Sequence, residues 1–321
     1  MVRNVPPAAV VSGEAEHPRA AMLDTMPAEE VVRFLVDEEA AAVRAARSCA
    51  AEIAQASRLL AERLEANGRL IYVGVGTAGR IAALEAAECV PLFGLPPSLI
   101  VSVLAGGPHA MARTVEISQD SRREAEQRMR HVAVGPGDLV CAVADKEISP
   151  FLQAAMEYAR FRRAHVVLVS CAQPPKGRTG EHEHDNDDGA AFADIVVKLA
   201  PGPEVVAGAT RLKAATAIKL AISAFSTAAF IQLGKTYGGV MVDVRPTTPR
   251  TWKRAIEVVS RMCSLDASEA EKLIKKAGGR AKVALVMHLT RVNAARAKEL
   301  LVQHRGSLRA IVGDIDLTGY T

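Results

Sequence analysis

The sequence predicts an α/β fold with a doubly wound parallel sheet and a helical subdomain at the C-terminal end. Three observations support this prediction. Short apolar runs rich in β-branched residues alternate with segments of helical periodicity between residues 70 and 199. The helical segments are long enough to connect parallel strands. Beyond Pro246 and Pro249, the periodicity is helical and is interrupted repeatedly.

The elements follow in order along the chain. The alanine-rich residues 27–66 have apolar side chains at helical spacing, which fits two or three helices, and Pro27 suits a first helical turn. Strands are expected at residues 70–73, 99–104, 139–143, 165–170 and 194–199. Helices are expected around 109–130 and over 150–161. Residues 205–233 should form a long helix that is apolar on almost every side, and is therefore buried in the core or at a subunit interface.

The chain divides into three expected parts: a loose N-terminal arm over residues 1–20, the main domain over 21–250, and a helical subdomain over 251–321. Breaks between short helices are expected at residues 264–266, 278–279, Asn293 and Gly306, with Asp266 or Ser268 capping the second helix. The many Lys and Arg residues of this subdomain are interpreted as a solvated surface.

The amino-acid composition argues against several classes of protein. The net charge is +4, from 40 basic and 36 acidic residues that are interspersed, and aromatic residues make up only 4%. This composition argues against a nucleic-acid surface. The five cysteines are scattered singly and mostly lie in apolar runs, as expected of buried thiols in a reducing cytoplasm. We expect neither a membrane span nor a secretion signal.

Residues 172–190 are rich in His and Asp, including His182, His184 and Asp185. A metal site is one interpretation of this composition. A solvated loop is the favoured one, because Gly and Pro are also frequent here. No metal is therefore expected.

The central motif is the stretch from Asn67 to Cys89, NGRLIYVGVGTAGRIAALEAAEC. A strand, a glycine turn over residues 74–79 and a helix form a layout that suits an anion, because free N–H groups at a helix N-terminus point toward the ligand. Gly74, Gly76 and Gly79 match the dinucleotide pattern G-x-G-x-x-G. The next strand, however, ends without the acid that would hold a ribose, so we expect no nucleotide cofactor and a smaller anionic ligand. Alternatively, the glycines serve only close packing.

Five segments carry a resemblance to a known family: GRLIYVGVGTAGRIAALEAAECVPLFG, SVLAGG, TVEISQDS, GPEVVAGATRLKAATAIKL and GKTYGGVMVDV. Together they resemble the N-acetylmuramic acid 6-phosphate etherases, from about residue 24 to 311. That family has the sugar isomerase (SIS) fold, and glucokinase regulatory protein is a relative. The resemblance implies an SIS-type sugar-binding domain, a homodimer, and a site that cleaves the lactyl ether of a phosphorylated amino sugar.

The implied reaction is an elimination across C2 and C3 followed by addition of water, which needs a base and an acid. The resemblance places one catalytic glutamate at Glu88, for which apolar neighbours suggest partial burial and a raised pKa. Gln119 occupies the place of the second glutamate, and an amide does not transfer protons at neutral pH. Glu116 precedes Gln119 by three residues and is a candidate to project into the same space, and His109 is a further candidate proton carrier.

The implied binding residues also depart from the family. The turn contributes Gly76, Thr77, Ala78 and Gly79, with Ala78 where the family usually has serine. In the second phosphate loop, residues 144–150, Ser149 retains a hydroxyl and Lys146 offers a charge for a phosphate or carboxylate. Asp145 and Glu147 would oppose a dianion unless they point elsewhere. Glu204 and Lys213, together with Thr210 and Arg211, belong to a third motif and are expected to line the ligand.

Two functions remain open. The first is a lyase acting on a sugar or sugar phosphate, with Glu88 as acid–base. The second is a non-catalytic regulator that senses a sugar phosphate, as glucokinase regulatory protein does. Gln119 is the feature that separates them, since losing one general acid or base typically reduces the rate by roughly 10²–10⁴.

Overall fold

The computed structural model describes residues 16–171 and 190–315, which form two compact units. The first unit runs to Ala87 and resumes over Pro97–Ser226, and the second joins Glu88–Pro96 to the chain from Thr227 onward. The helical subdomain expected over 251–321 falls within the second unit. Most of the expected N-terminal arm and of the His/Asp-rich loop lies outside the described residues.

The first unit is built on a five-stranded sheet of order β2-β1-β3-β4-β5, in which every pair of neighbours is parallel. The strands are β1 (Leu70–Gly74), β2 (Ile100–Leu104), β3 (Leu139–Ala144), β4 (His165–Ser170) and β5 (Ile195–Lys198). Each predicted strand is confirmed with shifts of one residue at most at either end. The chain order reverses between β1 and β3, which is where ligands enter such sheets.

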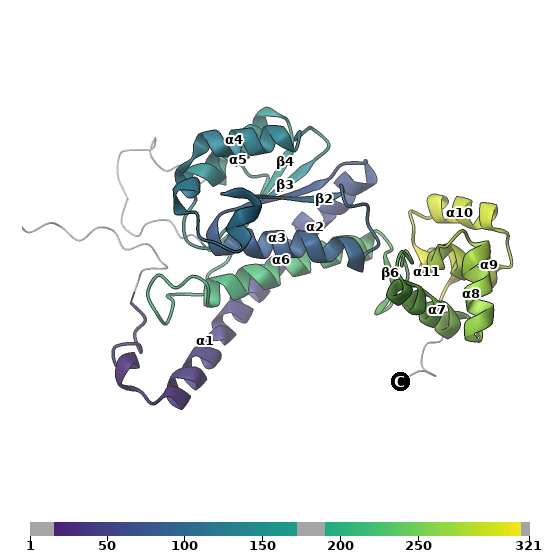
Figure 1. Cartoon of the computed structure of the whole chain (residues 1–321), viewed down its shortest axis with the longest axis horizontal. Helices are drawn as coiled ribbons and strands as arrows, with labels where there is room; N and C mark the ends of the chain where they lie inside the picture. Colours follow the sequence, from purple (N-terminus) through teal and green to yellow (C-terminus); the bar gives the residue numbers. More distant parts are fainter. Residues whose placement is uncertain (1–15, 172–189, 316–321) are drawn as a thin grey trace, which may run out of the picture. The chain divides into compact units, whose positions relative to one another are not determined.

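Helices cover both faces of this sheet (Figure 1). The covering helices are α2 (Ala50–Glu65), α3 (Gly76–Leu92), α4 (Arg122–His131), α5 (Pro150–Phe161) and α6 (Lys213–Gln232), and α1 (Ala28–Ser48) precedes them in the chain. Helices α4 and α5 lie on one face, and α2, α3 and α6 lie on the other. On the second face, the ring of Tyr72 meets that of Phe225 edge-on at a centroid distance of 6.4 Å. Because both faces are covered, the strands read as continuous apolar runs.

Two helix predictions were wrong in extent. The helix expected around 109–130 is three pieces, η2 (Gly107–Met111), η3 (Glu116–Asp120) and α4, because the Ser121 hydroxyl accepts from Glu124 N and starts a new helix. The helix expected over 205–233 begins only at Lys213. Gly202 and Gly208 have φ of +82° and +77°, which breaks the helical path before that point.

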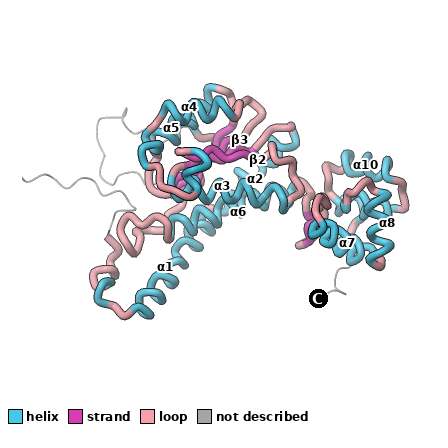
Figure 2. The backbone as a smooth tube through the Cα atoms, viewed as in Figure 1, coloured by secondary structure: helices cyan, strands magenta, loops and turns pink. Residues whose placement is uncertain are grey.

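After α6, the described part of the second unit has five helices and a short hairpin, and Figure 2 shows the helices joined by short loops. Its elements are β6 (Thr236–Tyr237), β7 (Val240–Met241), α7 (Pro249–Cys263), α8 (Ala267–Lys276), α9 (Ala281–Thr290), α10 (Ala294–Gln303) and α11 (Leu308–Val312). The predicted breaks between these helices are confirmed. Asp266 caps α8 and shares a capping box with Glu269. Six consecutive residues of α9 are buried, and five of them belong to the hydrophobic core of this unit.

By length and composition alone, α6 could cross a membrane. The sequence interpretation, which expected no membrane span, overlooked this property. In the structure, 56% of the apolar 18-residue stretch of this helix is buried. Ala217, Ile218, Ala221 and Ile222 are all fully buried, so the expectation of a buried helix is confirmed.

Candidate functional site

The glycine turn joins β1 to α3 with almost no loop. Strand β1 ends at Gly74 and α3 begins at Gly76, so the predicted turn is largely the first turn of the helix. A Cβ atom on Gly74 would lie 2.6 Å from the Cα of Gly79, which means that these two glycines allow the helix to approach the strand. Gly76 has φ of +52° and takes the left-handed conformation that turns the chain into the helix.

Gln119 lies over this turn. A Cβ atom on Gly76 would be 4.0 Å from Gln119 Nε2, and the Gln119 side chain is half-buried. Glu116 is exposed on the same short helix, η3. Residues three apart in a 3₁₀-helix share one side, so Glu116 and Gln119 project in similar directions. The structure thus brings Gln119 to the glycine turn, with an amide rather than a carboxyl group.

Glu88 occupies the later part of α3, twelve residues after Gly76, which corresponds to about 18 Å of helix. The side chain is exposed, so the prediction of partial burial was wrong. Its apolar neighbours Ala86 and Cys89 are buried because they belong to another face of the helix. The acid–base role of Glu88 stays a prediction.

Glu85, one turn before Glu88, is a polar residue that the sequence interpretation missed. Its carboxylate accepts hydrogen bonds from Ser223 Oγ at 2.8 Å and Ser226 Oγ at 2.5 Å, both on α6. No local signal identifies this arrangement, because the partners are about 140 residues apart in sequence. The contact fixes α3 against α6.

Asp145 follows β3, and its carboxylate accepts from Thr210 Oγ1 at 3.0 Å. Burial raises the pKa of Asp145, while this hydrogen bond, the backbone N–H groups of Asp145 and Ala78 and the charge of Lys146 act against that rise. That Asp145 would oppose a dianion at this loop stays a prediction.

The rest of this loop divides between solvent and the next helix. Lys146 is half-buried beside Asp145, and Glu147 is exposed. Ser149 is buried, and its hydroxyl accepts from Leu152 N at 3.2 Å as the N-cap of α5. A ligand role for Lys146 stays a prediction, and the Ser149 hydroxyl already has a structural partner.

Glu204 and Lys213 hold the start of α6. The two oxygens of Glu204 accept from Lys213 N at 3.0 Å and Ala214 N at 2.9 Å, and burial raises the pKa of Glu204 against the effect of these bonds. Lys213 Nζ donates to Glu38 Oε2 at 3.0 Å. Both residues are at most 2% exposed. Their side chains are thus committed to internal contacts, and a direct role in lining a ligand stays a prediction.

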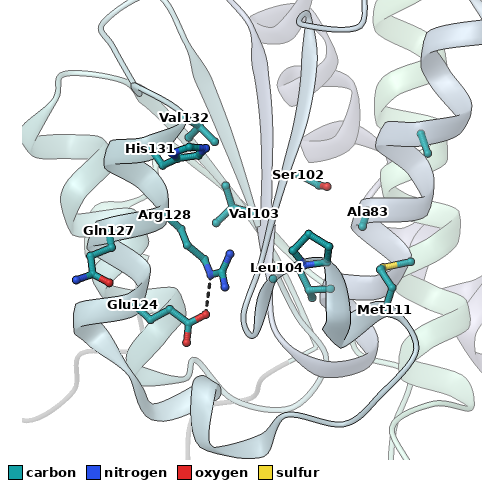
Figure 3. A pocket seen from close by; sticks show the side chains of 13 residues that line it. Ala83, Ser102, Val103, Leu104, Met111, Glu124, Gln127, Arg128, His131 and Val132 are labelled. Atoms are coloured by element: carbon teal, nitrogen blue, oxygen red, sulfur yellow. Dashed lines mark hydrogen bonds and ion pairs between the residues drawn. The ribbon is translucent and has the colours of Figure 1, made fainter.

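A separate pocket of about 710 Å³ surrounds the edge strand β2 (Figure 3). Arg128 and His131 of α4 lie on one side of the strand, and Ala83 of α3 and Met111 on the other. Glu124 accepts from Arg128 Nε at 2.6 Å and from Gly106 N at 2.9 Å, which holds the turn after β2. The predicted site residues are all in the described chain, and none of them lines this pocket. His109 is exposed on η2 nearby in sequence.

Across the residues that the structure describes, no group of three His, Cys, Asp or Glu side chains could hold a metal ion. The described cysteines, which are all five of the chain, are free and buried. The candidate site is placed at the ends of β1 and β3 because the strand order reverses there.

The sheet order, the glycine turn that opens α3 and the polar residues beyond β1 and β3 define an SIS-type α/β domain. The family model described as the glucokinase regulatory protein N-terminal SIS domain matches residues 52–160. A solved phosphoheptose isomerase from Francisella tularensis is 15% identical, with a TM-score of 0.42 over 64% of this chain and 100% of that one.

Curated relatives match nearly the whole chain. The N-acetylmuramic acid 6-phosphate etherase of Rhodopirellula baltica is 33% identical over 299 residues, covering 93% of this chain and 95% of the relative. The enzyme of the same name from Rubrobacter xylanophilus is 39% identical over 304 residues, covering 94% and 95%. The chain belongs to the N-acetylmuramic acid 6-phosphate etherase family.

Proposed function

We propose that the protein is a carbon–oxygen lyase that acts on a sugar or sugar phosphate carrying an ether-linked lactyl group. A base removes the C2 proton, the C3–O bond breaks, and the leaving oxygen takes a proton to give lactate. Water then adds across the C2–C3 double bond. The observation that carries this proposal is the similarity to etherases over more than nine-tenths of the chain.

Glu88 is the proposed acid–base. Its side chain is exposed to solvent. Gln119 stands where the family resemblance implies a second carboxyl group, and its amide can hydrogen-bond a hydroxyl without transferring a proton. We therefore expect a slow reaction on the family substrate, or a substrate whose leaving group needs less assistance from an acid.

The second candidate function is a non-catalytic sugar-phosphate sensor. Two observations favour it: the amide of Gln119 at the glycine turn, and the match of residues 52–160 to the domain of a regulatory protein. A sensor needs no proton transfer, so the replacement would have little effect on it.

Lactate release from N-acetylmuramic acid 6-phosphate separates the two functions. The assay compares the wild-type chain with Glu88→Gln and with Gln119→Glu. For a lyase, Glu88→Gln should abolish lactate release, and Gln119→Glu should accelerate it by roughly 10² or more, because a general acid is restored. Glu126→Gln, which changes an exposed acid on α4, is the matched control and should leave the rate unchanged.

The sensor is supported if none of these proteins releases lactate and the sugar phosphate still binds in calorimetry. Lactate release that persists in Glu88→Gln contradicts the assignment of Glu88. If no lactate is released and no sugar phosphate binds, both functions are contradicted.

A further inference from the structure

Strand β2 is an edge strand of the five-stranded sheet. At the two ends of its pairing with β1, Leu99 O accepts a hydrogen bond from β1 and Ala105 N donates one to it. Because the groups of a strand alternate in direction along the ladder, the N–H and C=O of Ile100, Ser102 and Leu104 point away from β1. Within the described part of the chain, no hydrogen bond joins these outward groups to another segment. The edge of β2 thus presents a row of donors and acceptors.

The sequence of β2 does not protect this edge. Edge strands are commonly blocked by proline, by charged side chains or by a bulge. Strand β2 reads IVSVL, without proline or charge, and all five residues pair with β1 in unbroken register. Ser102, at the centre of the strand, is exposed. An edge of this kind is suited to pairing with a further strand.

The pocket of about 710 Å³ at β2 has two chemically different sides (Figure 3). Its volume lies within the roughly 300–1,000 Å³ of ligand sites. On the side of α3 the lining is apolar and includes Ala83 and Met111, and on the side of α4 it includes Arg128 and His131. None of the candidate site residues lines this pocket, so it is a separate surface.

Arg128 gives the α4 side of the pocket a fixed positive charge. Its Nε donates to Glu124 Oε1 at 2.6 Å, and a Cβ atom on Gly107 would lie 2.7 Å from its Nη2. The guanidinium is therefore held against the turn that follows β2. Among the described residues, no hydrogen bond is made by its two Nη groups. A carboxylate matches the planar guanidinium and is the group that these donors suit.

We propose that the edge of β2 binds an extended segment of a partner protein in which apolar and acidic residues alternate. The main chain of the segment extends the sheet beside Ser102. Because the side chains of a strand alternate between its two faces, every second residue faces α3 and the others face α4. Apolar residues of the segment contact Ala83 and Met111, and an acidic residue pairs with Arg128. A second copy of β2 has no acidic residue to offer. This proposal does not depend on the proposed function.

Fluorescence anisotropy with the full-length chain tests the charge preference. The probes are two labelled peptides of the length of β2, one with alternating valine and glutamate and the other with lysine in place of glutamate. The wild type should bind the glutamate peptide at least about tenfold more tightly. Arg128→Glu should reverse this preference, because a like charge then faces the glutamate. Lys298→Glu makes the same change of charge on α10, at an exposed position, and should retain the wild-type preference.

Two further measurements test the pairing of main chains. Ser102→Pro removes one outward N–H, which an edge strand tolerates, and should weaken binding of the glutamate peptide at least about tenfold. Ser102→Ala keeps that N–H and is the matched control. Hydrogen exchange needs no variant: the amides of Ser102 and Leu104 in the wild type should become protected when the glutamate peptide binds. Thermal melting verifies that each variant is folded.

The proposal is overturned if the wild type binds neither peptide, if it binds both equally, or if a folded Ser102→Pro binds as tightly as Ser102→Ala. It is also overturned if the amides of Ser102 and Leu104 are already protected in the protein alone. In that case this chain or a second copy of it covers the edge.

Discussion

Buried charged side chains decide much of the chemistry of this protein at the level of single residues. Asp145 and Glu204 each place a carboxylate at the start of a helix, where backbone N–H groups stabilise it while burial raises its pKa. In the second unit, Lys282 is a buried cationic side chain. It is 4% exposed, and its Nζ donates to Gly234 O at 2.6 Å.

Lys282 makes the stability of the protein depend on pH in the alkaline range. Burial lowers the pKa of Lys282 to about 8, with Lys235 and Arg280 adding to the effect and Asp243 opposing it. In the unfolded chain the pKa is about 10.4. Between these values the unfolded state binds more protons, so the free energy of unfolding should rise with pH, by roughly 3 kcal/mol in total.

Urea denaturation from pH 7.5 to 10 measures this slope. In Lys282→Met the alkaline rise should disappear, while Lys298→Met, which changes a lysine on α10, should retain it. A slope that is equal in the wild type and Lys282→Met would show that Lys282 is not the titrating group.

At the level of elements, the contact between β1 and α3 defines the candidate site. The helix begins two residues after the strand ends, and the backbones at Gly74 and Gly79 touch. This closeness places Ala78 N–H at the end of β3, within reach of Asp145. Any side chain at Gly74 would push the helix away from the strand.

Gly74→Ala should therefore lower the free energy of unfolding by roughly 3 kcal/mol, since its methyl group would meet the Gly79 backbone at 2.6 Å. Gly135→Ala is the matched control, because nothing lies within 4 Å of a Cβ atom there. That change should stay within about 0.5 kcal/mol of the wild type. Chemical denaturation of both variants gives the comparison, and equal stabilities would contradict the close-contact argument.

At the scale of the whole molecule, α1 presents an apolar face to solvent. Val32, Val36 and Val43 are spaced by four and seven residues, and are 59%, 65% and 53% exposed. Figure 1 shows much of α1 standing clear of the sheet. Exposed valines on one side of a helix are unfavourable in a monomer, which fits the expected homodimer.

We expect a dimer at micromolar concentration in sedimentation equilibrium. Val36→Asp should shift the protein toward the monomer, because a charge would enter the contact. Val302→Asp introduces the same charge at a valine of α10 that is 80% exposed, and should leave the mass unchanged. A wild type that sediments as a monomer would contradict the dimer.

The sequence by itself determined the elements whose causes are local. The apolar runs of β1 to β5 and the breaks at Asp266, Asn293 and Gly306 followed from side-chain periodicity and capping, which act over a few residues. It also placed Glu88 on the helix that follows the glycine turn, whereas Gln119 lies on the short helix η3 and not on the long helix expected there. Where several short polar residues occur together, as around Ser121, the same local rules were ambiguous, and one predicted helix became three.

Only the tertiary structure decided where the charged side chains point. Asp145 and its partner Thr210 are 65 residues apart, and Glu85 is 138 residues from Ser223. The first pair lies beyond the end of β3, and the second joins two helices on one face of the sheet. No local pattern encodes either pair. The exposure of Glu88 depends likewise on which face of α3 the rest of the fold covers. The sequence thus determined which residues are available, and long-range packing decided the partners of Asp145 and Glu85.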